Sequence, residues 1–205
     1  MTKHWSISNQ ATNVPIVTDE KLLEDCARGD RGAQYRLYSQ CYSFMMSICI
    51  RYSNSRDDAE DLLNRGFLKV LNSIGKRRGN VPFGLWIRRI MINTIIDEYR
   101  KKKLLNEQRE LVDFDDRENE ADGTVINSYV EKMNAEQLQA LIDTLPETSK
   151  RIFNLFAVDG YSHKEIAAMT GMSEGTSKWH VNNARTRLKE LIAKNHLYHN
   201  KSIAS

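Results

Sequence analysis

Basic and amide side chains recur along one segment near the end of the chain, between Tyr161 and Ile192. Lys178, Asn182, Arg185 and Lys189 follow one another at steps of three and four residues. A helix would place all four on a single face. Ammonium, guanidinium and carboxamide groups are the side chains that meet the phosphates and base edges of DNA. The pattern therefore indicates a DNA-binding face.

Two short helices joined by a tight turn would position this face. Ser162 followed by Glu165 is a Ser-x-x-Glu capping box, which predicts a helix beginning at Ser162. Gly171 favours a left-handed helix end, and Ser173 favours the start of a second helix. The second helix would bury a stripe made of Ser177, Val181, Ala184, Leu188 and Leu191. These features predict a helix-turn-helix whose second helix enters the major groove. A helical hairpin with a basic outer face is the alternative.

Composition sets the class of protein. The chain has 205 residues, of which 40% are hydrophobic and 28% charged, as is typical of soluble globular proteins. No stretch approaches about 18 consecutive apolar residues, and the N-terminus lacks the apolar core of a signal peptide, so we expect a cytoplasmic protein. Cys26, Cys41 and Cys49 lack paired metal-ligand spacing. We expect them to be buried free thiols and expect no metal site.

Charge is distributed unevenly. Residues 1–103 hold 18 Lys and Arg against 11 Asp and Glu, and residues 133–205 hold 9 against 7, whereas residues 104–132 hold 3 against 9. Two basic modules flanking an acidic tether suit a nucleic-acid binder whose linker must not bind the same polyanion. The predicted fold is all-α, with two helical domains joined by an acidic linker. The expected divisions are an N-terminal tail (1–17), a first domain (18–103), the linker (104–132), a second domain (133–195) and a C-terminal tail (196–205).

Helical periodicity fills both domains. In the first, apolar stripes predict four helices, with a basic loop from Lys76 to Asn80 ahead of the last one. On that last helix Trp86 belongs to the apolar stripe, so we interpret it as a packing residue rather than a stacking platform for bases. The predicted helices are 18–29, 30–52, 56–74, 83–103, 125–144 and 146–158, followed by the helix-turn-helix.

Four blocks of sequence, in order over about 170 residues, resemble bacterial sigma factors of the extracytoplasmic-function type. This type belongs to the sigma-70 family and keeps only sigma regions 2 and 4. The matching blocks are LLEDCARGDRGAQYRLY, DDAEDLLNRGFLKVL, FGLWIRRIMINTIIDEYRKK and LPETSKRIFNLFAVDGYSHKEIAAMTGMSEGTSKWHVNNARTRLKEL. The resemblance implies that residues 18–103 are region 2, which binds core RNA polymerase and the −10 element, and that residues 133–195 are region 4, which binds the −35 element. It also implies that the acidic linker threads toward the RNA exit channel, although a solvated spacer is an equal alternative.

The resemblance assigns a polymerase-docking surface to the second and third helices. Its residues here are Asp58, Glu60, Asp61, Leu62 and Phe67. The chain departs from the family pattern just before Phe67, where Asn64, Arg65 and Gly66 replace a Gln, an acidic residue and a small or branched residue. Glycine inside a helix costs about 1 kcal/mol relative to alanine.

The resemblance also assigns two DNA-binding surfaces. The basic loop and fourth helix would catch unstacked bases of the −10 element by charge and stacking. The residues at or near the matching positions are Arg77, Arg78, Arg88, Arg89, Asn93, Arg100 and Lys101, and we expect Asp97 to orient Arg100 or Lys101. The −35 element would be bound by Glu174, Thr176, Lys178, Trp179, Asn182 and Arg185.

The sequence therefore predicts a transcription initiation factor that binds core RNA polymerase, recognises promoter DNA and promotes strand opening. No pair of carboxylates, nucleophile with base, or phosphate-cradling glycine loop occurs, so we expect no catalysis, no cofactor and no small-molecule substrate. The resemblance implies a further partner, an anti-sigma factor of the kind that is often membrane-anchored. Two alternatives remain open: a DNA-binding regulator of the response-regulator output type, and a sigma-like protein that does not recruit polymerase, which Arg65 and Gly66 motivate.

Overall fold

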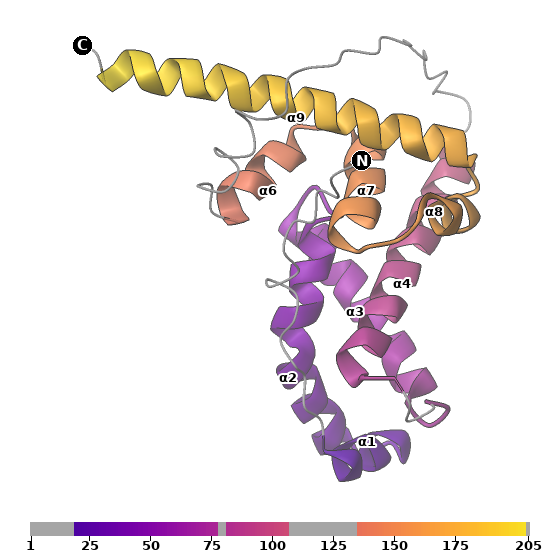
Figure 1. The fold of residues 1–205 in the computed structure, drawn as a ribbon. Coiled ribbons are helices and arrows are strands. Elements are labelled where there is room, and N and C mark those ends of the chain that lie inside the picture. Colours follow the sequence, from indigo (N-terminus) through magenta and orange to yellow (C-terminus); the bar gives the residue numbers. More distant parts are fainter. Residues whose placement is uncertain (1–18, 78–80, 107–134, 204–205) are drawn as a thin grey trace. The chain divides into compact units, whose positions relative to one another are not determined.

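The computed structural model describes residues 19–77, 81–106 and 135–203, which form only helices and their connections (Figure 1). The all-α prediction is confirmed. The chain divides into two compact units, Met1–Gln108 and Arg109–Ser205. No helix within the described residues is long and apolar enough to cross a bilayer.

The first unit contains the four predicted helices. They are α1 (Glu20–Ala27), α2 (Arg31–Ile50), α3 (Arg56–Ile74) and α4 (Phe83–Asn106). Short polar side chains cap three of them: Asp19 accepts from the backbone of Lys21, Asp30 from that of Ala33, and Ser55 from that of Asp58. Each helix thus begins within about two residues of the start that its cap and periodicity predict.

Helices α2, α3 and α4 pack on one another, and α1 lies across one end of them (Figure 1). The apolar stripes that predict α2 and α3 are mostly buried, although Tyr52, Leu62 and Leu71 are only half-buried. Helix α4 buries a wider face than its stripe predicts. Ile92 and Ile96 are buried in addition to Ile87 and Met91. This follows because α4 packs against both α2 and α3, so that two of its sides are covered.

The three cysteines all lie in this core and form no disulfide, as predicted. Burial raises the pKa of Cys41 and of Cys49 to about 12. Both side chains are therefore protonated thiols that pack as small apolar groups.

The second unit contains α6 (Ala135–Asp143), α7 (Glu147–Phe153), the π-helix η2 (Asn154–Val158), α8 (His163–Thr170) and α9 (Glu174–Ile203). In Figure 1, α6, α7 and α8 lie along one side of the long helix α9. Phe153 is central to the core that joins them. Its buried neighbours are Ile142, Leu145, Ala184 and Leu188.

The expectation of one regular helix over residues 146–158 is wrong. The backbone widens into a π turn after Phe153, where the amide of Asp159 donates to the carbonyl of Asn154, five residues back, at 2.9 Å. A π turn holds more residues than an α turn, so the side chains after it are rotated relative to a continuous α-helix. Ile152 and Phe153 are buried, whereas Phe156, which apolar periodicity would also place on the buried face, is half-buried.

Candidate nucleic-acid interface

The helix-turn-helix forms as its sequence signals predict. The backbone amide of Glu165 donates to Ser162 Oγ (3.2 Å) while the amide of Ser162 donates to Glu165 Oε2 (2.8 Å), which completes the capping box of α8. Gly171 ends that helix with φ of 75°, a left-handed conformation that glycine adopts without strain. Ser173 Oγ then accepts from the backbone of Thr176 (3.0 Å) at the start of α9.

The inward face of α9 follows the predicted stripe with two additions. Ser177, Val181, Ala184 and Leu188 are buried, whereas Leu191 is half-buried. His180 and Ile192 are also buried, which the sequence analysis missed. The ring of His180 has Nδ1 3.0 Å from Ser149 Oγ of α7, so a polar pair lies inside this apolar seam. Burial lowers the pKa of His180 and favours the neutral ring.

The predicted −35 residues separate into two groups. Glu174, Lys178 and Asn182 are exposed on α9. Thr176 is half-buried, with Oγ1 2.8 Å from Ser173 Oγ. Trp179 is half-buried too and contacts the ring of His180 edge-on, with ring centroids 4.9 Å apart. Lys178 and Asn182 thus lie one turn apart on α9 and expose a basic group and an amide group.

Arg185 differs from these exposed side chains. It is half-buried, and its guanidinium carbon lies 5.5 Å from the centre of the Phe156 ring of η2. The same ring stacks on the imidazole of His163, with centroids 4.4 Å apart and an interplanar angle of 15°. Burial lowers the pKa of Arg185, which nevertheless stays charged at neutral pH.

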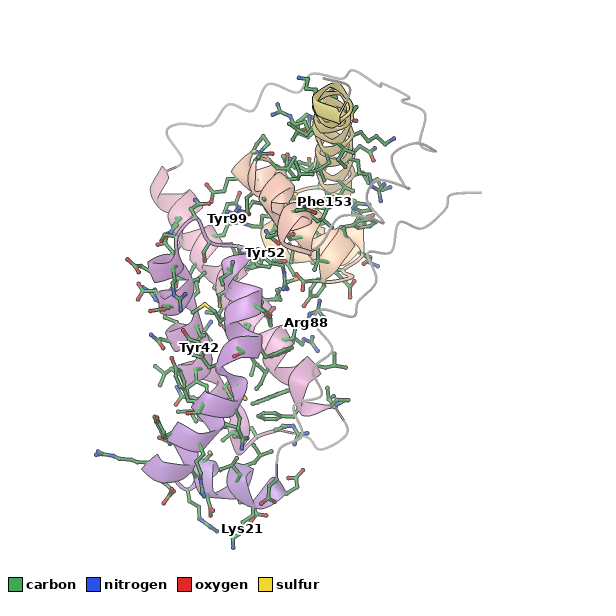
Figure 2. All side chains as sticks on the ribbon, turned by 90° about the vertical axis from the view of Figure 1, so that its left-hand side faces the viewer. Lys21, Tyr42, Tyr52, Arg88, Tyr99 and Phe153 are labelled. Atoms are coloured by element: carbon green, nitrogen blue, oxygen red, sulfur yellow. The ribbon has the colours of Figure 1, made fainter. Side chains whose placement is uncertain are left out.

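In the first unit, the predicted −10 residues lie along α4. Arg89, Asn93, Arg100 and Lys101 are exposed, and Arg88 is half-buried. Figure 2 labels Arg88 and Tyr42, which lie on different sides of this unit. Arg78 lies outside the described residues. The structure adds an apolar feature, because Leu85 is 57% exposed one turn before Arg89 and Val81 is 45% exposed just ahead of the helix.

Arg77 is engaged within its own unit. Its side chain is 10% exposed, its Nη2 donates to the carbonyl of Val81 (3.0 Å), and its guanidinium lies 5.5 Å from the centre of the Phe83 ring. Nη1 also lies 3.7 Å from Glu20 of α1. These contacts connect Arg77, near the start of the basic loop, to the residues that follow the loop. Trp86, expected to pack in the core, is half-buried and stacks on Phe83 at 5.7 Å.

Ion pairs link α3 to α4, and one of them gives Asp97 a partner that we did not expect. Its carboxylate pairs with Lys69 of α3 at 2.8 Å. Glu98 instead takes Lys101, one turn on, and also Arg65 of α3, each at 3.1 Å. The hydrogen bond from Lys101 and the charge of Arg65 lower the pKa of Glu98, against the opposing effect of burial. Arg65 therefore has a partner inside its own domain.

The predicted polymerase-docking residues lie on α3 beside α2, with unequal exposure. Asp58 and Asp61 are exposed, Glu60 and Leu62 are half-buried, and Phe67 is only 8% exposed. Phe67 packs edge-on against Tyr38 of α2 with ring centroids 5.0 Å apart, so it supports this surface from beneath.

Tyrosines of α2, which the sequence analysis did not single out, complete the same surface. The hydroxyl of Tyr38 donates to Asn64 Oδ1 (3.1 Å) and that of Tyr42 to Glu60 Oε1 (3.5 Å). Tyr35 is 73% exposed. The spacing of these tyrosines, at three and four residues, was the signal available in the sequence.

Two protein-family models match this chain, one in each of its two units. The family model for sigma-70 region 2 matches residues 37–104, and that for sigma-70 region 4 matches residues 135–188. The ECF RNA polymerase sigma-E factor of Haemophilus influenzae is 28% identical over 183 residues, which span 86% of this chain and 96% of that relative. The ECF RNA polymerase sigma factor SigE of Mycolicibacterium smegmatis is 28% identical over 171 residues, spanning 82% and 66% respectively.

Among solved structures, a sigma factor RpoE from Bartonella quintana, in complex with the anti-sigma factor NepR, is similar at 20% identity with a TM-score of 0.46. The match covers 78% of this chain and 96% of that one. The two family models together cover more than half of the 205 residues, in the order in which sigma factors carry them. The chain belongs to the sigma-70 family and is a sigma factor of the ECF type.

Proposed function

We propose that this protein is a transcription initiation factor that binds core RNA polymerase, recognises −10 and −35 promoter elements and promotes strand opening. One observation carries the proposal: each matched sigma region falls within one compact helical unit, region 2 in Met1–Gln108 and region 4 in Arg109–Ser205. A factor of this design supplies two separate contacts with DNA.

Recognition of the −35 element is assigned to α9. Lys178 and Asn182 are exposed on its outer face, and Glu174 lies in its first turn. An amide can accept and donate in a pair of hydrogen bonds to adenine, whereas a lysine neutralises phosphate. Thr176, Trp179 and Arg185 complete the proposed set, with Arg185 in a more restrained position than the others.

Recognition and opening of the −10 element are assigned to α4 and the loop before it. Exposed Arg89, Arg100 and Lys101, together with Arg88, supply positive charge along the helix, and exposed Asn93 supplies an amide group. Leu85 and Val81 supply apolar surface of the kind that is inserted between or against unstacked bases. Arg78 belongs to the proposed set by sequence alone, and Arg77 is assigned the role of holding the loop through Val81 and Phe83.

Binding of core RNA polymerase is assigned to the outer surface of α2 and α3. Asp58, Glu60, Asp61 and Leu62 supply acidic and apolar contacts, and Tyr38 and Tyr42 extend them. Phe67 is assigned a supporting role because it is buried beneath Tyr38. The unusual Arg65 pairs with Glu98, which supports a structural reason for its presence.

The remaining partners and properties follow from membership of the family. We propose promoter DNA and core polymerase as partners, an anti-sigma factor as a regulator, and action in the cytoplasm without catalysis of its own. The acidic linker, residues 104–132, lies almost wholly outside the described residues, and its proposed route toward the RNA exit channel rests on the resemblance.

The test is transcription from a library of randomised promoters with the purified protein and core RNA polymerase of its own host. Specific transcripts whose templates share two upstream elements are expected. A matched reaction with Asp58→Arg and Asp61→Arg together should lose these transcripts and lose co-elution with core enzyme. Absence of specific transcripts with the unaltered protein, despite co-elution, would overturn the proposal of promoter recognition; absence of co-elution would overturn polymerase binding.

A further inference from the structure

One aromatic ring in the second unit contacts two elements of the helix-turn-helix at once. The ring of Phe156, in η2, stacks on His163 at the start of α8 and also lies beneath the guanidinium of Arg185 on α9. The distances are 4.4 Å between ring centroids and 5.5 Å from the guanidinium carbon to the ring centre. Arg185 thus has its cationic end held by a side chain from outside its own helix.

The π turn places Phe156 where it can make both contacts. In an unbroken α-helix, Phe156 would follow Ile152 and Phe153 on the buried face, because residues three and four apart share a face. Instead Ile152 and Phe153 are buried while Phe156 is half-buried. π turns are often found at functional sites, because they redirect a side chain without ending the helix.

A second link ties the same cluster to the beginning of α9. Nδ1 of His163 lies 3.0 Å from the hydroxyl of Ser177, which is fully buried. Ser177 and Arg185 are eight residues apart, or about 12 Å along a helix. Side chains from outside α9 therefore contact this helix at two points, Ser177 and Arg185, which lie more than two turns apart. These two contacts restrain rotation of α9 about its axis.

We infer that Phe156 is a positioning residue that holds the Arg185 guanidinium in one orientation for base recognition in the −35 element. Reading guanine requires two parallel N–H groups in a fixed plane, so a guanidinium resting on a ring is already ordered before DNA arrives. A guanidinium on a free side chain would lose its rotamer freedom on binding. This inference rests on the proposed function and adds the residue that gives Arg185 its specificity.

The test uses the full chain with core RNA polymerase and a promoter recovered from a randomised library, together with every single base-pair substitution in its upstream element. Phe156→Leu keeps an apolar side chain but removes the ring, and Phe156→Tyr keeps the ring. Arg185→Ala removes the guanidinium that is proposed to recognise the base. We expect Phe156→Leu to reduce discrimination about tenfold at the base pair where Arg185→Ala also reduces it. Phe156→Tyr should restore discrimination, and Phe156→Leu combined with Arg185→Ala should discriminate no worse than Arg185→Ala alone.

The salt dependence of binding gives a readout that a loss of folding would not mimic. Phe156→Leu retains every charge, so its slope of log affinity against log salt should equal that of the unaltered protein. Discrimination by Phe156→Leu equal to that of the unaltered protein would overturn the inference. Uniform weakening on all upstream sequences, with the same pattern of preference, would also overturn it and assign Phe156 to the fold.

Two further results test the inference, one from promoter preference and one from NMR. Should the unaltered protein show no preference among upstream sequences, the proposed −35 function fails, and the inference about Arg185 fails with it. Should Phe156→Leu not fold, the Nε–Hε NMR signal of Arg185 in the unaltered full chain decides. A signal shifted by the ring current of Phe156 supports the inference, and a signal at the position of a free arginine overturns it.

Discussion

Gly66 of α3 lies directly against Met91 of α4. A Cβ atom added to Gly66 would overlap Sδ of Met91 and come within 2.6 Å of its Cε, and Met91 is itself fully buried. The two helices approach closely at this point because position 66 has no side chain. The glycine that departs from the family pattern thus has a packing role, and its cost in helix propensity is offset by the close approach of α3 and α4.

Gly66→Ala should destabilise the first unit, although alanine is the better helix former. The gain of about 1 kcal/mol in helix propensity is opposed by about 1–3 kcal/mol of overpacking. We expect a net loss of about 1 kcal/mol in the free energy of unfolding, measured by urea denaturation. The matched control is Gly84→Ala on α4, where nothing lies within 4 Å of an added Cβ and stability should rise. A rise of equal size at both positions would show that α3 and α4 accommodate the methyl group.

Arg65→Glu should destabilise the same unit without improving polymerase binding. The change restores the acidic residue that the family pattern has, but it sets a carboxylate beside Glu98, which is now paired with Arg65 at 3.1 Å. Arg65 is 55% exposed, so we expect at most about 1 kcal/mol of destabilisation. Core polymerase affinity, measured by fluorescence anisotropy, should be unchanged or weaker. Binding about tenfold tighter would instead mean that Arg65 limits docking, as the alternative of a sigma-like protein that does not recruit polymerase requires.

Local signals in the sequence predicted the helices and the outer face of α9, since caps and periodicity act over a few residues. The capping box of Ser162 and Glu165 and the left-handed Gly171 are examples. The π turn after Phe153 was missed because neither caps nor apolar periodicity distinguishes one π turn from an α turn in a short segment. Likewise, nothing near Asp97 in the sequence pointed to Lys69 as its partner, because the two lie 28 residues apart and are brought together by packing of α3 on α4.

Stability of the second unit should fall as the pH drops below about 6.5. The pKa of His163 is lowered by burial and then by the charges of Lys178 and Arg185, against the effect of Glu174, and burial lowers that of His180. The folded unit therefore binds fewer protons than the unfolded chain near pH 6, so the free energy of unfolding is greatest above the unfolded value of 6.5 and declines below it.

Thermal unfolding between pH 8 and pH 5.5 would measure this decline, with Trp179 fluorescence as the probe in a Trp5→Phe, Trp86→Phe background. His180→Gln removes one titrating ring and should flatten the dependence, even if the unit starts from a lower stability. A melting temperature that rose on acidification would contradict the assigned direction of both pKa shifts.

Lys178→Ala should weaken binding to all promoters to a similar degree. An exposed lysine on the outer face of α9 is expected to neutralise one phosphate, so its loss should reduce the slope of log affinity against log salt by about 0.9. Lys194→Ala, on the same helix beyond the proposed contact region, should leave the slope unchanged. Loss of preference at a single base pair, with an unaltered slope, would instead assign Lys178 to a base edge.

Leu85→Ala should slow strand opening while leaving polymerase binding intact. Leu85 is 57% exposed one turn before Arg89, so it can cover an unstacked base while the arginine meets a phosphate. Loss of about 1.4 kcal/mol of such contact corresponds to about a tenfold fall in the yield of open complexes, read from permanganate reactivity of unpaired thymines. On a template with a pre-melted −10 bubble, the defect of Leu85→Ala should shrink, because the energy needed to unstack the bases has already been supplied. An equal defect on that template would mean that Leu85 contributes to DNA binding and not to strand opening.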